Sequence, residues 1–291
     1  MTRPQRILLK TTIPTLEDDW HVGRFSLLAD HLAGLTGGDG AALYVVTAHD
    51  RIETPAGDDA DLAAAAEGAY DQLWLFGVDV TGALTDADCA HIDRFRGRGG
   101  GVFITRDHQD LGACLSRLGA LGLTQHFQTV NPEPDVSRRR IDDRITTEIS
   151  WPNYHSGANG DFQAIAVDEP PHPLMRRADG GPIRYLPSHP HEGAVGPAPR
   201  AGVETRVVAT GTSQATGVRF NLAVAVEEAG RGRAVSDSSF HHLCDFNWEP
   251  ARGCPSFVCE TPGDGLARSP EAMSDSRRYA ENIAAWLAGA V

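Results

Sequence analysis

Short apolar runs alternate with amphipathic segments along the first 120 residues of the chain. Four of these runs have the length and composition of buried strands: 5–12, 41–46, 72–76 and 102–105. Segments of helical character follow them: 22–35, 62–70, 85–96 and 111–118. Strands that alternate with helices predict βαβ units, and right-handed crossovers then place helices on both faces of a parallel sheet. The pattern therefore predicts a doubly wound, flavodoxin-like α/β fold with a mainly parallel sheet.

Proline changes the character of the chain between residues 132 and 199. Eleven of the eighteen prolines fall in this stretch, which has few long apolar runs. Because proline cannot continue a helix or pair fully in a central strand, we expect a loop-rich insertion at about 132–200, with strands near 164–167 and 183–186. Further apolar strands and a closing amphipathic helix follow: 206–209, 220–226, 233–237 and 279–287. We interpret residues 1–291 as one α/β domain that carries this insertion.

Composition excludes several function classes. The formal net charge of −13 disfavours binding to nucleic acid or to an anionic membrane, because both interactions require a basic surface. No apolar stretch approaches the length of a membrane span, and the run 7–9 is too short for an export signal. We therefore expect the protein in the cytoplasm, where its five cysteines stay reduced, and none of them forms a C-x-x-C pair.

The scarcity of lysine bears on cofactors. Lys10 is the only lysine and lies inside the first predicted strand, so a P-loop lysine is missing and Schiff-base chemistry has almost no candidate residue. The first strand is followed by Thr-Thr-Ile-Pro rather than by G-x-G-x-x-G, which argues against a dinucleotide site. We expect no nucleotide cofactor and a small-molecule substrate as the partner. The sequence leaves self-association into a homo-oligomer open.

Polar side chains gather directly after the predicted strands. In open parallel sheets, ligands bind beyond the carboxyl ends of the strands. Asp107 and His108 follow the fourth strand, and His241 follows the last one. We predict His108 and His241 as general acid or base and Asp107 as an orienting or attacking group. The substrate-binding candidates, with either arginine holding an anionic group, are His21, Arg24, Arg106, His155, His189 and Asp237. For any one of these residues, an ordinary polar loop is the alternative.

Two histidine clusters suggest a metal site. Each cluster combines imidazole with carboxylate: His189-x-His191-Glu192 and His241-His242-x-x-Asp245. Such sets are common ligands of zinc or iron, although neither cluster matches a specific signature such as H-E-x-x-H. Adjacent histidines usually point to different sides, so we expect at most one of His241 and His242 in the site. His191, Glu192 and His242 are the candidate ligands of a divalent metal such as zinc, with hydrogen-bonded or general-base histidines as the alternative.

Several pieces of the sequence follow a pattern known from one superfamily of α/β proteins. They are Asp71-Gln-Leu-Trp-Leu-Phe-Gly, Leu84-Thr-Asp, Phe95-Arg-x-Arg-Gly-Gly-Gly-Val-Phe-Ile-Thr, and Gly232-Arg233-Ala-Val followed by His241-His242. The pattern resembles the class I glutamine amidotransferase-like superfamily, in particular its ThuA-like branch, mainly over 70–125 and 200–245. The resemblance implies a flavodoxin-like sheet with a site at the strand-to-helix elbow.

The elbow departs from the superfamily at its nucleophile. Glutamine amidotransferases carry a cysteine there, paired with a His-x-Glu, whereas this chain has Asp107 and His108. Glutaminase activity is therefore not expected. The run Ser188-His-Pro-His-Glu192 is similar to the His-Pro-Glu run of amidotransferases but precedes the final strands, so no triad role is assigned to it.

We therefore hypothesise an amidotransferase-like enzyme that hydrolyses a small polar substrate. One alternative is a non-catalytic ligand-binding or assembly subunit that has kept the fold and lost the nucleophile. Another is a metal-dependent lyase or oxidoreductase that uses the histidine clusters. The enzyme hypotheses depend on one geometric expectation, which is that distant stretches of the chain deliver imidazoles and carboxylates to a common edge of one sheet.

Overall fold

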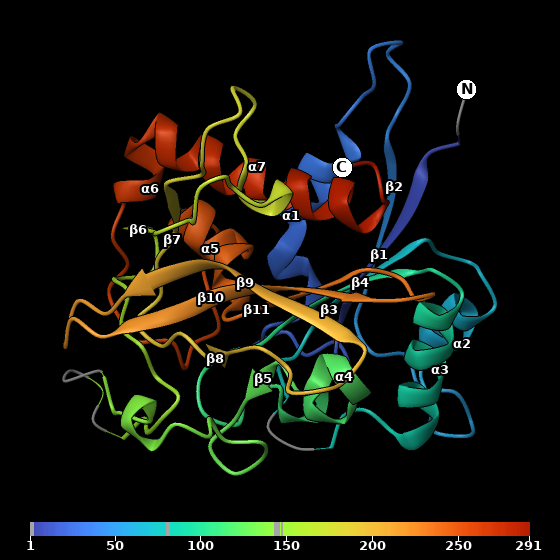
Figure 1. The fold of residues 1–291 in the computed structure, drawn as a ribbon, viewed down its shortest axis with the longest axis horizontal. Helices are drawn as coiled ribbons and strands as arrows, with labels where there is room; N and C mark the ends of the chain where they lie inside the picture. Colours follow the sequence, from blue (N-terminus) through green and yellow to red (C-terminus); the bar gives the residue numbers. More distant parts are fainter. Residues whose placement is uncertain (1–2, 80–81, 143–145, 147) are drawn as a thin grey trace.

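The computed structural model describes residues 3–79, 82–142, 146 and 148–291. Seven strands form its main sheet: β1 (Gln5–Thr11), β2 (Tyr44–His49), β3 (Gln72–Phe76), β4 (Gly101–Thr105), β9 (Val203–Thr212), β10 (Arg219–Glu228) and β11 (Ala234–Asp237). Their order is β2-β1-β3-β4-β11-β10-β9 (Figure 1). The first five strands in this order run parallel, and β10 is antiparallel to both of its neighbours. The mainly parallel α/β sheet predicted from the sequence is confirmed.

Helices cover both faces of this sheet, as Figure 1 shows. On one face lie α1 (Ser26–Ala33) and α7 (Pro270–Leu287), and on the other lie α2 (Ala60–Ala66) and α3 (Asp86–Gly97). The two cores follow from the alternation of side chains along each strand, because neighbouring residues point to opposite faces. In β1, Leu9 packs in the core under α1 and α7, and Leu8 packs in the core under α2 and α3.

Local signals set most element boundaries. Thr85 and Asp88 each accept a hydrogen bond from the backbone N–H of the other, which forms a capping box at the start of α3. The second strand starts three residues later than predicted, because Ala42 pairs with Thr36 in the return from α1. The predicted helix at 111–118 is instead the 3-10 turn η2 (Ala113–Arg117) followed by the single turn α4 (Gly119–Gly122). One glycine with positive φ directly precedes η2, and another is the first residue of α4. This backbone conformation is not helical, so the segment does not form one continuous helix.

The insertion contains little regular structure, as its prolines predict. β6 (Phe162–Ala164) pairs with β7 (Tyr185–Pro187), and β5 (Gln125–His126) pairs with β8 (Ala194–Val195), both antiparallel. The remaining short helical turns of the chain are η1 (Val22–Phe25), η3 (Val136–Arg138), η4 (Pro173–Met175), η5 (Phe240–His242), α5 (Asp245–Trp248), η6 (Pro250–Arg252) and α6 (Gly265–Arg268). Tyr154 and Glu192 exchange backbone hydrogen bonds of 3.0 and 2.9 Å, which hold two polar stretches of the insertion side by side.

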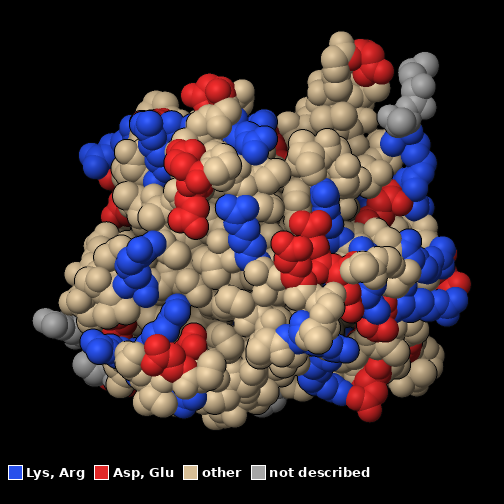
Figure 2. Space-filling model, in the orientation of Figure 1, with Lys and Arg blue, Asp and Glu red and all other residues tan. Residues whose placement is uncertain are grey.

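Charged side chains of both signs are interspersed over the face of the molecule shown in Figure 2. Some of the pairs join distant segments, such as Arg177 of the insertion with Glu271 and Asp275 of α7. None of the helices in the described ranges is long and apolar enough to cross a lipid bilayer.

His172 makes the anchoring of the insertion sensitive to pH. Its Nδ1 accepts a hydrogen bond of 3.2 Å from the N–H of Leu174, and its ring meets the edge of Trp286. Burial and the nearby Arg206 lower the pKa of His172 to about 4. Since this lies below the value of about 6.5 in the unfolded chain, the stabilising contribution is complete above pH 6.5 and is lost as the pH falls towards 4. His172→Asn keeps an acceptor that does not titrate. We expect it to reduce the fall in urea midpoint between pH 6.5 and 4.5, and equal falls in both proteins would contradict this.

Candidate functional site

Asp107 lies at the centre of the candidate site, two residues after the end of β4. Its side chain is almost fully buried, with 4% of the residue exposed. Oδ1 accepts a hydrogen bond of 2.8 Å from the N–H of His108 and lies 3.1 Å from Nδ1 of the same residue. The strand that precedes it is buried along its whole length, so the carboxylate is carried by a rigid element.

His241 reaches Asp107 from the turn after β11. Its Nδ1 lies 2.9 Å from Oδ1 of Asn247, and Nδ2 of Asn247 donates to the carbonyl of Ser188 at 2.7 Å. Because the second bond turns the amide oxygen of Asn247 towards the imidazole, Nδ1 of His241 carries a proton and donates it. Nε2 is then the atom that faces Oδ2 of Asp107, at 3.7 Å.

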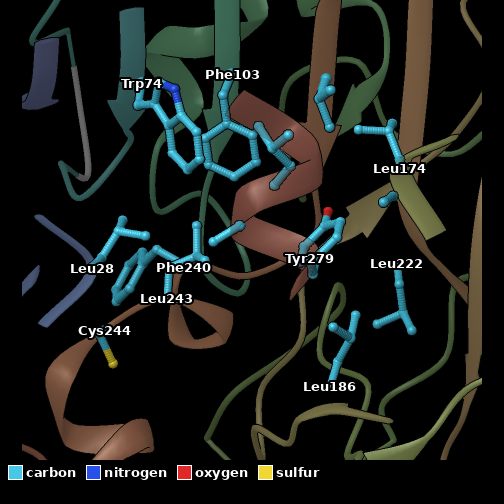
Figure 3. Packing of buried hydrophobic residues seen from close by; sticks show 14 of the residues in the cluster. Leu28, Trp74, Phe103, Leu174, Leu186, Leu222, Phe240, Leu243, Cys244 and Tyr279 are labelled. Carbon is cyan, nitrogen blue, oxygen red and sulfur yellow. The ribbon is translucent and has the colours of Figure 1, made fainter. Parts of the chain in front are cut away.

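An apolar cluster fixes the turn that carries His241. Phe240 lies near Leu28 of α1 and Leu243 in the core shown in Figure 3. Its ring centroid is 5.2 Å from that of Trp20, which belongs to the segment between β1 and η1. Since buried aromatic contacts define a single packing arrangement, the imidazole on the next residue has little freedom to move.

His189 arrives from the insertion, at a point of close backbone approach. Gly193 donates to the carbonyl of Ser238 at 3.0 Å, and a Cβ on this glycine would lie only 2.7 Å from the carbonyl oxygen of Asp107. His189 stacks on His241, with ring centroids 3.6 Å apart and planes 9° apart. Its Nδ1 lies 3.5 Å from Oδ1 of Asp107. The insertion thus places a second imidazole beside the same carboxylate.

His191 extends the cluster towards the opening of the site. Its Nδ1 lies 3.0 Å from Oδ1 of Asn153, and its Nε2 lies 3.0 Å from Oε1 of Glu260. The hydrogen bond from His191 holds the pKa of Glu260 below its ordinary value. The ring centroid of His191 is 5.2 Å from that of His108 and 5.5 Å from that of His189. Imidazoles from three parts of the chain therefore meet around Asp107.

Asp107 couples the charges of this cluster. Burial opposes its ionisation, but the imidazoles of His108 and His189 outweigh burial and hold the pKa of Asp107 well below its ordinary value. Burial and the neighbouring His241 lower the pKa of His189. Burial also opposes protonation of His241, but Cys244 and Asp107 outweigh it and raise the pKa of His241 to about 10. At neutral pH, the stacked pair therefore contains one charged ring and one neutral ring beside an ionised carboxylate.

A cavity of about 400 Å³ opens over this cluster, a volume suited to a small molecule. The segments that follow β1, β3, β4 and β11 contribute Trp20, Val78, Asp107 and His241 to its wall. Asn159 of the insertion also lines it, and among the described residues its buried Oδ1 has no hydrogen-bond partner. Buried polar atoms are nearly always paired, so an N–H or O–H of a bound molecule would satisfy this acceptor.

Glu192, Asp237 and His242 lie beneath the cavity and are fully buried. His242 Nδ1 is 2.9 Å from Oδ1 of Asp237, and its Nε2 is 3.2 Å from Oε1 of Glu192. Tyr279 of α7 donates to Oδ2 of Asp237 at 2.6 Å. The two carboxylates raise the pKa of His242 well above its ordinary value, although burial opposes this. The polar atoms of Glu192, Asp237 and His242 therefore bond to one another. For this reason the structure does not bring Glu192 and His242 together with His191 as a set of metal ligands, and it does not present Asp237 to a substrate.

The side chain of Arg106 also lies in the protein interior and does not line the cavity. Its side chain is fully buried, and its guanidinium donates to the carbonyls of His126 and Gln109 and lies 4.0 Å from the ring centroid of Phe127. Burial lowers the pKa of Arg106 to about 9. The predicted anion-holding role does not fit this position, because backbone carbonyls already occupy the guanidinium.

Three other predicted binding residues lie outside the cavity wall. Arg24 donates through Nε to the carbonyl of Asp19 at 3.0 Å. His21 accepts a hydrogen bond of 3.2 Å from the N–H of Gly23 and so caps the turn η1. His155 lies in the insertion and is partly buried. Of the predicted substrate-binding residues, His189 is the one that the structure brings to Asp107.

Some residues of the site were not predicted from the sequence. Trp20 lies beside the predicted His21 in the segment that follows the first strand, so the search after strand ends reaches it, but only polar residues of that segment were selected as site candidates. Asn247 and Glu260 follow no predicted strand directly, and their positions depend on how the chain folds back after η5. No local signal in the sequence marks either of them.

No protein-family model matches the chain, and no curated protein matches it. A ThuA-like protein from Parabacteroides merdae has a similar structure, with 13% identity and a TM-score of 0.45, over 98% of this chain and 90% of that one. A GMP synthase protein from Thermoplasma acidophilum has 6% identity and a TM-score of 0.42, over 98% and 97%. A cytoplasmic protein from Salmonella typhimurium has 11% identity and a TM-score of 0.40, over 83% and 94%. Each of these likenesses is at 13% identity or less, and none of them assigns a family or an activity to this chain.

Proposed function

We propose that the chain is an enzyme that hydrolyses a small polar substrate in the cavity above Asp107. The observation that supports this most is the ionised, buried carboxylate with His108, His189 and His241 around it. Burial of several titratable groups at one place costs folding free energy. Clusters of this kind, with shifted pKa values and a cavity above them, are typical of catalytic sites.

The positions of the groups suggest their roles. Asp107 and His241 form the charged centre at which a water molecule would be polarised. The His108 side chain is 18% exposed, against 5% for Asp107 and 2% for His241, so it is best placed to exchange protons with solvent. Asn159 would accept a hydrogen bond from the substrate.

Hydrolysis at this centre needs no covalent intermediate, in keeping with the absence of an elbow cysteine. The oxygen of the water forms a bond to the electrophilic atom of the substrate, and its proton passes to His108. The bond to the leaving group breaks, and the leaving group departs with that proton.

The experiment compares His108→Ala and His241→Ala with the unmodified protein. The probes are the p-nitrophenyl acetate, phosphate and β-glucoside, which represent three classes of hydrolysis. We expect each variant to lose turnover by about 10²- to 10⁴-fold, the usual contribution of a positioned acid or base. His49→Ala is the control, because this side chain is 45% exposed, lies outside the cavity wall and should leave turnover unchanged. Full activity in both variants, or no hydrolysis of any probe by the unmodified protein, contradicts the proposal.

A further inference from the structure

We infer that Asp107, His189 and His241 form a binding site for one divalent transition-metal ion of the zinc class. The part of the inference that concerns what the ion does rests on the proposed function, and the part that concerns binding does not. Among the described residues, these three make a group in which one ligand atom from each lies within 4.8 Å of the others. Two imidazoles and one carboxylate are a common ligand set for zinc and iron.

The distances in the group suit an ion better than direct hydrogen bonds. Oδ1 of Asp107 is 3.5 Å from Nδ1 of His189, and Oδ2 of Asp107 is 3.7 Å from Nε2 of His241. Both distances exceed the usual N–H···O range of about 2.7–3.2 Å. Ligand atoms bound at about 2.1 Å in a tetrahedral arrangement are about 3.4 Å apart. The carboxylate therefore stands almost at the spacing from each imidazole that a shared ion requires, and the two imidazole ligand atoms lie within 4.8 Å of each other.

The surroundings orient the ligand atoms. Asn247 accepts a hydrogen bond from Nδ1 of His241, so Nε2 faces Asp107 and can bind an ion that displaces its proton. Asn247 is itself held by Ser188. A hydrogen bond to the far nitrogen of a histidine is the usual support of a metal-bound imidazole. Ligands of the group are at most 4% exposed, which protects the bonds to the ion from competing water.

The arrangement leaves coordination positions open. Three protein ligands occupy one side of the ion, and the cavity of about 400 Å³ lies on the other. A tetrahedral site with three protein ligands and one open position is the catalytic form of zinc, in which the pKa of a bound water falls to about 7. Such a water would be the nucleophile of the proposed hydrolysis, with His108 next to it as the proton acceptor.

One feature must change when an ion binds. The rings of His189 and His241 are stacked, with planes 9° apart, and the lone pairs of parallel rings do not meet at one point. Both nitrogens can bind the same ion only if the rings tilt towards each other. We expect a zinc-bound crystal structure to show the stack opened and the positions of Asp107 and Asn247 kept.

The experiment measures metal binding by the full chain after treatment with EDTA. Isothermal titration with Zn²⁺ should give one site per chain, and Co²⁺ should give the visible absorption of a tetrahedral complex. His189→Ala should weaken Zn²⁺ binding by at least about 100-fold, and Asn247→Ala should weaken it by about 10- to 100-fold. The matched control is His49→Ala, whose side chain is 45% exposed and lies outside the cavity wall, so this variant should bind Zn²⁺ like the unmodified protein.

Several outcomes would overturn the inference. These are no Zn²⁺ binding by the unmodified protein, or equal loss in His49→Ala and His189→Ala. His189→Gln, which is closer in size, replaces His189→Ala if circular dichroism shows that the alanine variant is unfolded. The p-nitrophenyl probes separate this inference from the proposed function. If the chain binds Zn²⁺ but hydrolyses none of the probes, the metal site is supported and the proposed hydrolase is overturned. If a chain freed of metal by EDTA hydrolyses a probe at an unchanged rate, the hydrolase is supported and the metal site is overturned.

Discussion

Asp107→Asn is expected to reduce turnover by about 10²- to 10⁴-fold while the chain stays folded. The amide has the shape of the carboxylate, and its oxygen can still accept the hydrogen bond from the N–H of His108. It lacks the negative charge that polarises water beside His241 or binds a cation. Because the change leaves the charged ring of His241 without its buried counter-charge, we expect the urea midpoint at pH 7 to fall. Steady-state kinetics with the p-nitrophenyl probes and urea unfolding measure the two effects.

The control for this change is Asp110→Asn, three residues further along the chain. Asp110 accepts hydrogen bonds from the N–H and the hydroxyl of Thr129 and does not line the cavity. The same chemical change should therefore leave turnover as it is. If Asp107→Asn keeps more than about a tenth of the turnover, the carboxylate is not part of the machinery.

His242→Ala is expected to destabilise the chain by about 3–5 kcal/mol, which is a large share of the stability of a domain. In the folded protein, its imidazole lies between the carboxylates of Asp237 and Glu192, and all three residues are 0% exposed. Removal of the ring leaves two buried acidic groups without their cationic partner. Urea unfolding at pH 7 measures the loss.

An exposed histidine pair provides the comparison. His49 lies 3.0 Å from Asp61 with 45% of its side chain exposed, so His49→Ala should cost no more than about 1 kcal/mol. If both variants lose the same free energy of unfolding, burial of the network around His242 does not determine how much that network stabilises the chain. A loss below about 1 kcal/mol in His242→Ala would contradict the prediction itself.

The sheet could be predicted because parallel strands buried on both faces are continuous apolar runs. The run 72–76 coincides with β3, which is fully buried, and its bounds are those predicted. The second strand was placed three residues early, because a run of apolar letters does not show where the chain turns back from α1. The prediction of a helix at 111–118 was wrong. Gly112 adopts a positive φ that interrupts the helix, and the composition of the segment does not show that conformation.

The candidate site could be predicted in part, since strand ends are visible in the sequence. Asp107, His108 and His241 lie at the ends of β4 and β11, and the structure gathers them. Which residue of an adjacent pair faces the cavity depends on the conformation of one turn. In the insertion, His189 and His191 line the cavity and Glu192 does not, and the turn at Pro190 and His191 sets which side each of them faces.

The long-range partners could not be predicted. Arg106 stands at a strand end like the residues of the site, but its long side chain turns inwards to the carbonyls of Gln109 and His126. Its partners lie in irregular segments whose paths are set by tertiary packing. The same reason applies to Asn247, which orients His241 from α5.

The hydroxyl of Tyr279 has a consequence for synthesis on the ribosome. Its hydrogen bond to Asp237 connects the last long helix to the network beneath His241. The strands β1–β4 can pair early in translation, whereas this support is complete only after α7 has emerged and docked. A nascent or prematurely released chain would therefore possess half of the sheet and no working centre. Activity would appear only when translation has passed residue 279, and incomplete chains would be inert.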